Sequence, residues 1–427
     1  MPDRRVRRRY FLSCGILSIL FILALLGLFA SVSIWPAVGA QGAEVMRRLV
    51  GDDAVARVEG LVFQVQDRLH QWQYSRGAKP AAPWDVAGPV SPVLASLPTA
   101  TISTGEKITN TTEPQAPGEP GEAPVLNPDL APTQAPATAV PLPSAAPTWV
   151  PPAVAVSGSL AGEGQWSPYI QDAAGSVVAY RTFLQPDADR PYAVAAVVAF
   201  DLAATRLHYV LGIDEPTSDV KVDRPGTIAA ADMQPGVLLA VFNGGFKGRH
   251  GRYGVMVNDT VVIPPRDGLG TLAIYRDGKV RIGAWGSDIT ASHDILAWRQ
   301  NGPLLIQKGQ INPLTAEDST LYWGSTVDGE GVVPTWRSAV GISPDGNTLY
   351  YLAGKDLTIP ALAQALYGVG ASAAIQLDIN NYWVHFGAIS FEGGKPTTQP
   401  LFKEMNDNVN RYLYPYSRDF FYVTSIH

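Results

Sequence analysis

Prolines divide this chain into a part that can fold and a part that cannot bury enough apolar surface to do so. Residues 80–152 hold 17 of the chain's 35 prolines, mixed with Ala, Thr, Ser and Glu. Such a composition does not offset the entropy lost when a chain is ordered. We therefore predict a disordered, extended linker over residues 79–153, which would hold the folded residues that follow away from the N-terminus.

The N-terminus has the pattern of a membrane anchor. Five arginines stand among the first nine residues, and no charged residue occurs from Tyr10 to Ala43. An apolar run of this length can span a bilayer core of roughly 30 Å as a helix, and the arginines favour the cytoplasmic side. We predict a basic cytoplasmic tail at 1–9, a single-pass anchor in the cell membrane at 10–38, and an extracytoplasmic remainder. A cleaved signal peptide is the alternative, because the small residues "AVGA" precede Gln41.

Composition excludes several classes of function. The net charge of −6 over 427 residues is mild, whereas binding to nucleic acid needs a basic face, so we predict no nucleic-acid partner. Cys14 is the only cysteine and lies in the apolar run, where we interpret it as a small membrane residue. Disulfides, cysteine metal clusters and catalytic thiols are therefore excluded from the rest of the chain.

Residues 41–78 have the periodicity of a helix. Apolar side chains recur at steps of three and four among charged and amide residues, namely Val58, Leu61, Val62, Val65, Leu69 and Trp72. One interpretation is a short coiled coil, with weak self-association of two copies through residues 45–72. The other is a membrane-proximal amphipathic helix without a fixed partner, which suits a pattern of only about two heptads.

Strand patterns dominate the segment after the linker. Apolar and β-branched runs bounded by turn residues predict strands at 176–184, 192–201 and 205–213, and an apolar run at 238–246 breaks into a glycine turn. Turn signals predict hairpins around Asn258-Asp259, Asp277-Gly278 and Pro344-Asp345-Gly346.

One helix interrupts these strands. In "TIPALAQALYGVGA", Thr358 stands in the N-cap position and Pro360 in the first turn, and Gly368 or Gly370 would end the helix. The strand "AAIQLD" follows directly. We therefore predict an α+β fold in which residues 154–427 form a single mixed, strand-rich globular domain.

The first candidate site is the end of a buried strand at Asn243-Gly244-Gly245. Paired glycines let the backbone approach a ligand closely, and the Asn243 amide can donate and accept hydrogen bonds. Four basic residues follow that could face an anion, namely Lys247, Arg249, His250 and Arg252. A tight turn with solvated basic residues would explain the same pattern, and the sequence alone does not choose between the two.

The second candidate is Arg337, which enters the strand "RSAVGIS" of small and apolar residues. A charge near a core needs a partner, and a guanidinium suits bidentate binding of phosphate or carboxylate. The alternative is a structural ion pair with a carboxylate such as Asp378.

The third candidate is Asp378 and the polar and aromatic residues after it. Asp378 stands at the C-terminal end of a predicted strand, and Asn380, Asn381, Trp383 and His385 follow within seven positions. Amides can bind hydroxyl or phosphate oxygens, an indole can stack on a sugar ring, and a histidine can carry a proton. Core packing of the aromatic ring and a structural histidine are the simpler alternatives.

Several common motifs are missing from the sequence. It contains no phosphate-binding Gly-x-x-x-x-Gly-Lys-Ser/Thr loop, no dinucleotide glycine fingerprint, no His-Glu-x-x-His and no Gly-x-Ser-x-Gly. No pair of histidines has the spacing of metal ligands. We assign no residue to a metal, and the sequence leaves any cofactor unknown.

Taken in order, the motifs resemble the phosphodiester glycosidase domain family. Asn-Gly-Gly-Phe at 243–246 is followed by Asn-Gly-Pro-Leu-Leu at 301–305 and by Arg-Ser-Ala-Val-Gly with a hairpin at 337–341. The predicted helix and the strand ending at Asp378 come next. The resemblance covers roughly 193–386, and the family has many exported bacterial members.

The chain departs from the family pattern in the residues that directly follow Asp378. Family members typically continue as Asp-Gly-Gly-Gly-Ser, whereas this chain has Ile379-Asn380-Asn381-Tyr382 after the aspartate. Bulkier residues restrict the backbone and its approach to a phosphate. Either the substrate differs or hydrolytic activity has been lost.

The resemblance implies hydrolysis of a sugar-1-phosphodiester in the cell envelope or an exopolysaccharide. Arg337 would hold the phosphate, Asp378 would stabilise the sugar cation or direct water, and Asn243 would orient oxygens. The expected substrate-binding residues are Gly244, Gly245, Asn380, Asn381, Trp383 and His385. The expected partners are an envelope glycan or sugar phosphodiester, and the membrane through residues 10–38. The alternative function is a non-catalytic glycan-binding envelope module on the same fold, and a purely structural envelope protein is a third.

Overall fold

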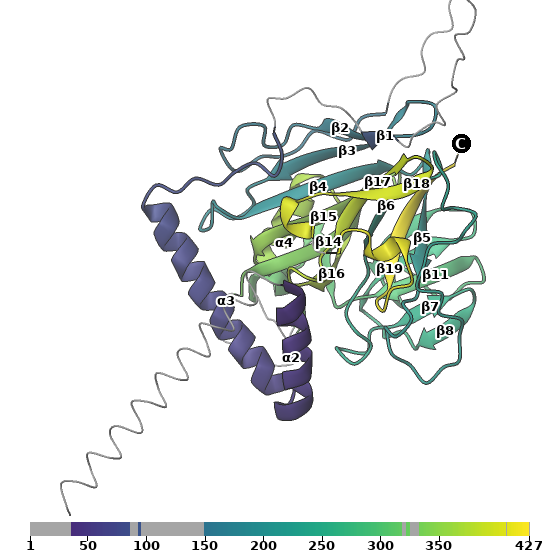
Figure 1. Cartoon of the computed structure of the whole chain (residues 1–427), viewed down its shortest axis with the longest axis horizontal. Coiled ribbons are helices and arrows are strands. Elements are labelled where there is room, and N and C mark those ends of the chain that lie inside the picture. Colours follow the sequence, from purple (N-terminus) through teal and green to yellow (C-terminus); the bar gives the residue numbers. More distant parts are fainter. Residues whose placement is uncertain are drawn as a thin grey trace, which may run out of the picture. The chain divides into compact units, whose positions relative to one another are not determined.

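The structure is a computed structural model of the chain and describes residues 36–85, 93–94, 149–317, 322–324, 333–406 and 408–426. Three sheets and three α-helices make up most of this described part (Figure 1). Short 3-10 turns complete it, namely η1 (Pro313–Glu317), η2 (Lys403–Asn406) and η3 (Arg411–Leu413).

The largest sheet has nine strands in the order β1-β2-β3-β4-β15-β14-β16-β12-β13. They are β1 (Val93–Leu94), β2 (Ser167–Gln171), β3 (Val177–Leu184), β4 (Val194–Asp201), β15 (Thr348–Leu357), β14 (Thr335–Ile342), β16 (Ala373–Ile379), β12 (Leu304–Gln307) and β13 (Gln310–Ile311). Only β1 and β2 pair parallel in this sheet. The strand-rich character predicted from the sequence is confirmed, and the sheets are almost entirely antiparallel.

Two five-stranded sheets complete the domain, in the orders β10-β9-β11-β7-β8 and β18-β17-β6-β19-β5. The first contains β7 (Val255–Val257), β8 (Thr260–Ile263), β9 (Gly270–Tyr275), β10 (Val280–Ala284) and β11 (Ile295–Gln300). The second contains β5 (Thr205–Val210), β6 (Leu238–Asn243), β17 (Phe386–Glu392), β18 (Lys395–Pro400) and β19 (Phe420–Ser425).

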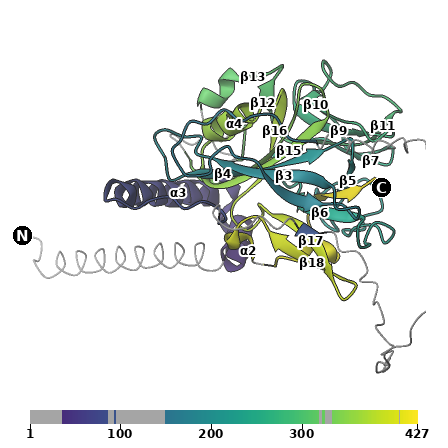
Figure 2. The same ribbon diagram turned by 90° about the horizontal axis from the view of Figure 1, so that it is seen from above.

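Both faces of the large sheet are buried, as the alternation along β4 shows. Val198 and Phe200 belong to the main core with Phe242 of β6, whereas Val197 belongs to a second core with Leu366 of α4 (Ile359–Gly368). A strand places successive side chains on opposite faces, so the uninterrupted apolar sequence of β4 follows from its central position. In Figure 2 the large sheet accordingly lies between α4 and the strands β17 and β18.

The N-terminal described segment forms two helices, α2 (Pro36–Val50) and α3 (Asp52–Ser75). The helical structure predicted over 41–78 is found, but Gly51 adopts φ 91° and divides it into two helices. Arg47 donates to both carboxylate oxygens of Glu59 at 2.8 Å and so ties the two helices together.

Ion pairs hold α3 against the domain. The Asp67 carboxylate accepts from Nε and Nη2 of Arg190 at 2.9 and 3.0 Å and from the Tyr192 hydroxyl. His70 Nδ1 lies 3.1 Å from the Asp356 carboxylate. The apolar stripe Leu61, Val65, Leu69 and Trp72 is exposed. Self-association through residues 45–72 therefore stays a prediction.

The predicted anchor and linker fall largely outside the described residues. Of the anchor, residues 10–35 are not described, and the described helices include none that is long and apolar enough to span a membrane. Two described pieces of the predicted linker contact the domain: β1 pairs with β2, and the Trp84 ring packs edge-on against Phe183 at 5.6 Å.

The cap of α4 offers a test of the local structure. The Thr358 side chain accepts a hydrogen bond from the Ala361 amide at 3.2 Å, as the sequence predicts for an N-cap. Thr358→Ala should lower the free energy of unfolding by about 1 kcal/mol, because it leaves that amide without the side-chain acceptor. Thr358→Ser keeps the hydroxyl and should retain most of the stability. Equal loss in both variants, measured by urea denaturation, would contradict the capping role.

Candidate functional site

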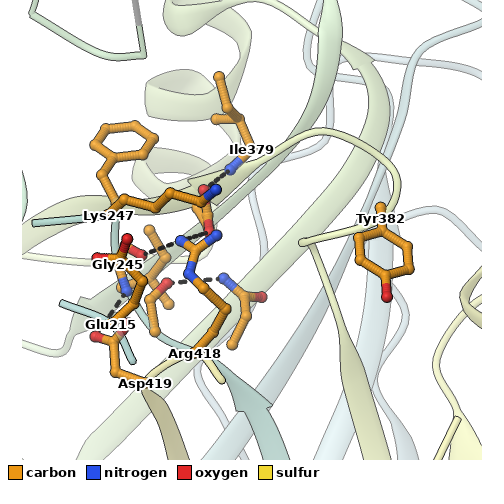
Figure 3. A network of polar contacts seen from close by, with 12 residues as sticks. Glu215, Gly245, Lys247, Ile379, Tyr382, Arg418 and Asp419 are labelled. Atoms are coloured by element: carbon orange, nitrogen blue, oxygen red, sulfur yellow. Dashed lines mark hydrogen bonds and ion pairs between the residues drawn. The ribbon is translucent and has the colours of Figure 1, made fainter. Parts of the chain in front are cut away.

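The candidate site lies where three strand ends meet. β6 ends at Asn243, β16 ends at Ile379, and β19 begins at Phe420, which pairs with Asn243. The Asp378 amide donates to the Gly244 carbonyl at 3.1 Å and so joins the large sheet to the β6 sheet. Residues that are more than a hundred positions apart in the sequence therefore come together here (Figure 3).

The side chain of Asn243 is buried and joins several strands at this junction through hydrogen bonds. Its Nδ2 donates to the Gly244 carbonyl and to Ser338 Oγ at 3.0 and 2.9 Å. Its Oδ1 accepts from the Tyr351 hydroxyl and from the His385 amide, each at 3.0 Å. With 2 % of its surface exposed, Asn243 uses these four bonds to position the site rather than to contact a substrate.

Gly244 and Gly245 allow close packing of charged side chains against the backbone. A Cβ on Gly244 would lie 2.6 Å from the Asp419 carboxylate carbon, and one on Gly245 would lie 2.8 Å from Asn301 Oδ1 and 2.9 Å from the Arg299 guanidinium carbon. The glycines therefore open the backbone to the protein's own side chains. A direct approach of substrate to them stays a prediction.

Asp378 and Arg418 form the central ion pair. Arg418 Nη2 donates to Asp378 Oδ2 and, at 3.0 Å, to the Gly245 carbonyl, while Asp378 Oδ1 accepts from the Ile379 amide at 3.0 Å. Burial raises the pKa of Asp378, the Arg418 charge opposes this rise, and the result is a pKa of about 6. The Nε of Arg418 has no hydrogen-bond partner among the described residues.

A second ion pair lies beside the first. Arg299 Nε donates to Asp419 Oδ2 at 2.9 Å, and the Tyr209 hydroxyl donates to the same oxygen at 3.0 Å. Burial alone would lower the pKa of Arg299, but the charge of Asp419 raises it. Both side chains are essentially inaccessible, so this pair supports Arg418 through its neighbour Asp419 and does not face solvent.

Trp383 and Lys247 border the central pair. The Arg418 guanidinium carbon lies 4.5 Å from the centroid of the Trp383 ring, and Lys247 Nζ lies 5.3 Å from it. The indole therefore contacts both cations. Trp383 is partly exposed, whereas Asp378 and Arg418 are 6 % and 4 % exposed, so the predicted residue Trp383 lies between the ion pair and solvent.

Arg337 does not join this cluster. Its guanidinium donates to the carbonyls of Leu357, Trp323 and Val333 and to Gln376 Oε1, at 2.9 to 3.1 Å. The side chain is 1 % exposed. Its geometry indicates that it anchors β14, and the alternative pairing with Asp378 is replaced by the pairing of Asp378 with Arg418.

The remaining predicted residues have different surroundings. Asn380 lies in a turn with φ 74°, a left-handed conformation that Asn tolerates. Its backbone amide donates to the Trp336 carbonyl oxygen at 2.9 Å. Asn381 is partly exposed on the same turn. His385 is fully buried, its Nε2 lies 3.0 Å from the Val409 carbonyl oxygen, and burial holds its pKa well below the usual range. Its environment does not suit proton exchange with a substrate.

Sequence reasoning missed Arg299, Arg418 and Asp419. The argument applied to Arg337, that a charge in an apolar strand needs a partner, applies equally to Arg299 in "ILAWRQ". The adjacent charges of Arg418 and Asp419 directly precede the apolar strand "FFYVTS". Both signals were present, although neither identifies which charges pair.

Gly244 tests the packing of this site. Gly244→Ala should lower the free energy of unfolding by about 1–3 kcal/mol, because the new methyl group collides with Asp419. Gly60→Ala is the matched control, because Gly60 lies in α3 and a Cβ there meets nothing within 4 Å. This substitution should leave the free energy of unfolding unchanged or raise it. Thermal denaturation in which Gly244→Ala is as stable as the unsubstituted chain would contradict the packing argument.

Comparisons with solved structures give weak overall similarity. The catalytic domain of zebrafish N-acetylglucosamine-1-phosphodiester alpha-N-acetylglucosaminidase, auto-inhibited by pro-peptide, is 16 % identical, with a TM-score of 0.37 over 60 % of this chain and 86 % of that chain. A hypothetical protein from Synechocystis is 11 % identical, with a TM-score of 0.33 over 61 % and 64 % of the two chains. A putative exported protein from Burkholderia pseudomallei is 14 % identical, with a TM-score of 0.25 over 54 % and 74 %.

Comparison with sequence families is more specific. No curated protein sequence is significantly similar to this chain. The phosphodiester glycosidase family matches residues 236–378, a segment that begins just before β6 and ends at Asp378. The resemblance inferred from the sequence is thus confirmed over residues 236–378, which match the phosphodiester glycosidase family.

Proposed function

We propose that this protein is a phosphodiester glycosidase that hydrolyses a sugar-1-phosphodiester, with Asp378 and Arg418 at its reacting centre. The supporting observation is that the family-matched segment ends at a carboxylate that binds a guanidinium beside the Gly244-Gly245 backbone. Arg418 takes the phosphate-holding role expected of Arg337, since the Arg337 guanidinium is directed at backbone carbonyls.

The chemistry requires little acid catalysis. The bond between the anomeric carbon and the phosphate oxygen breaks, and the phosphate monoester leaves with that oxygen and the bonding electrons. Water adds to the anomeric carbon and loses a proton to the ionised Asp378 carboxylate, which also stabilises the sugar cation. Arg418 compensates the charge that develops on the leaving phosphate. A bound phosphate would replace part of the Asp378 interaction with Arg418.

The location of the reaction follows from the N-terminal sequence. We keep the proposal of a single-pass anchor at residues 10–38, a cytoplasmic tail and an extracytoplasmic domain that acts on the cell envelope or an exopolysaccharide. The charge-free run after the arginines supports it.

Removing the carboxylate charge tests the catalytic role. Asp378→Asn should lower the release of free sugar from sugar-1-phosphodiesters by about a hundredfold or more, the usual worth of a positioned base. Asp277→Asn, in an exposed hairpin turn, removes the same charge and should have no effect. Because Asp378→Asn leaves Arg418 without its carboxylate, thermal denaturation must show that the variant is folded. A folded variant with full activity would overturn the assignment.

The pH dependence gives an independent test. Asp378 acts in its ionised form, and its pKa of about 6 lies above its ordinary value, so activity should be about tenfold lower at pH 5 than at pH 7. The rate of sugar release should rise with pH through about 6 and then level off. A rate that is constant or falls between pH 5 and 7 would exclude the ionised carboxylate as the required form.

A glycan-binding module is the second candidate. The observation that favours it is the low exposure of Asp378 and Arg418, which bind each other beneath Trp383. In that case glycan binding would persist in Asp378→Asn, no phosphodiester would be hydrolysed, and Trp383→Ala would weaken binding through loss of the aromatic surface. Equilibrium binding of envelope glycans, measured beside sugar release, separates the two functions.

A further inference from the structure

The helix α2 places a carboxylate on the loop next to the proposed site. Glu44 Oε2 accepts from Lys247 Nζ at 2.8 Å, and both Glu44 oxygens accept from Arg249 Nη2 at 2.9 and 2.8 Å. Lys247 and Arg249 belong to the segment 247–252, which we call the basic loop, and Glu44 lies about two hundred positions away in sequence. Two cations of one loop therefore bind one carboxylate.

The basic loop is held in place before any ligand arrives. The Gly248 amide donates to Glu215 Oε2 at 2.8 Å, and that oxygen also accepts from the Thr217 amide at 2.8 Å. A Cβ on Gly248 would lie 2.5 Å from the Thr217 carbonyl oxygen, so the loop packs closely there. Figure 3 shows Lys247 beside the cluster that contains Arg418. These contacts fix the backbone of the loop, which lowers the entropy that its two cations lose when they bind an anion.

The interaction of Glu44 with the loop is electrostatic. Burial raises the pKa of Glu44, but the hydrogen bond and charge of Lys247 and the charge of Arg249 outweigh this effect and lower it to about 2. Glu44 is therefore ionised at neutral pH. The C-terminal half of α2 leaves four apolar side chains exposed, namely Val45, Met46, Leu49 and Val50, so α2 rests on this face through charge and not through burial of these side chains.

We propose that Lys247 and Arg249 form a phosphate-binding subsite beside Arg418, which Glu44 fills in this structure and which binds a phosphate group of an anionic saccharide when Glu44 withdraws. The subsite rests on the proposed function in that it would bind a phosphate of the same polymer as the reacting diester. A phosphate suits the site because its oxygens and charge match two adjacent cations better than a single carboxylate does. Trp383, near Lys247, offers an aromatic face to the attached sugar.

Phosphate binding to the full chain tests the subsite. Isothermal titration calorimetry with inorganic phosphate should show about tenfold tighter binding to Glu44→Gln than to the unsubstituted chain. The reason is that phosphate can bind only the fraction of molecules in which Glu44 does not fill the site, which lowers the apparent affinity of the unsubstituted chain. Adding Lys247→Gln to Glu44→Gln should abolish the gain. Glu392→Gln, at the exposed last position of β17, changes the net charge equally and should leave phosphate binding unchanged.

The outcomes separate this proposal from the proposed function. Equal phosphate affinity with and without Glu44→Gln, an equal gain in Glu392→Gln, or a gain that survives Lys247→Gln would each overturn the subsite. Tighter binding of glucuronate than of phosphate to Glu44→Gln would overturn the assignment to phosphate. If the expected binding is found while no variant releases sugar, the subsite stands and the hydrolase proposal fails.

Discussion

The buried ion pair between Asp378 and Arg418 is the interaction on which the rest of the site depends. Two opposite charges with so little exposure are tolerated only when their remaining hydrogen-bonding groups are also satisfied. Here the Ile379 amide and the Gly245 carbonyl supply much of that satisfaction. Because these backbone groups come from the ends of β16 and β6, the pair also fixes how the two sheets meet. Loss of either charge would cost about 3–5 kcal/mol in such a setting.

The glycines explain how so many charges fit at one junction. Gly244 and Gly245 leave the space into which Asp419, Asn301 and Arg299 are packed. The Gly244-Gly245 motif, which suggested close approach of a ligand, therefore makes room for the protein's own charged and polar side chains. Asn243 continues this role, since its hydrogen bonds connect β6 to β14, to β15 and to the segment before β17.

Local features of the fold were predictable from the sequence, and long-range pairings were not. The α4 helix, its Thr358 cap and the hairpin turn at Asp277-Gly278 follow from side-chain preferences over a few residues, and the structure agrees. The break at Gly51 was missed because the periodic residues used for the prediction, Val58 to Trp72, all lie after it. Asp378 was found because it ends an apolar strand. Its partner Arg418 lies 40 residues away and was not found, since no local pattern specifies which of several buried arginines meets which carboxylate.

Charge balance connects the proposed chemistry to the N-terminal helix. The two buried pairs, Asp378 with Arg418 and Asp419 with Arg299, are each neutral. Lys247 and Arg249 are additional cations at the edge of this cluster, and Glu44 is the carboxylate that binds them. Without Glu44, the potential beside Arg418 becomes more positive, which favours an anionic substrate and also favours the ionised form of Asp378. In the proposed subsite, a single carboxylate on α2 therefore controls whether Lys247 and Arg249 can bind phosphate beside the proposed catalytic residue.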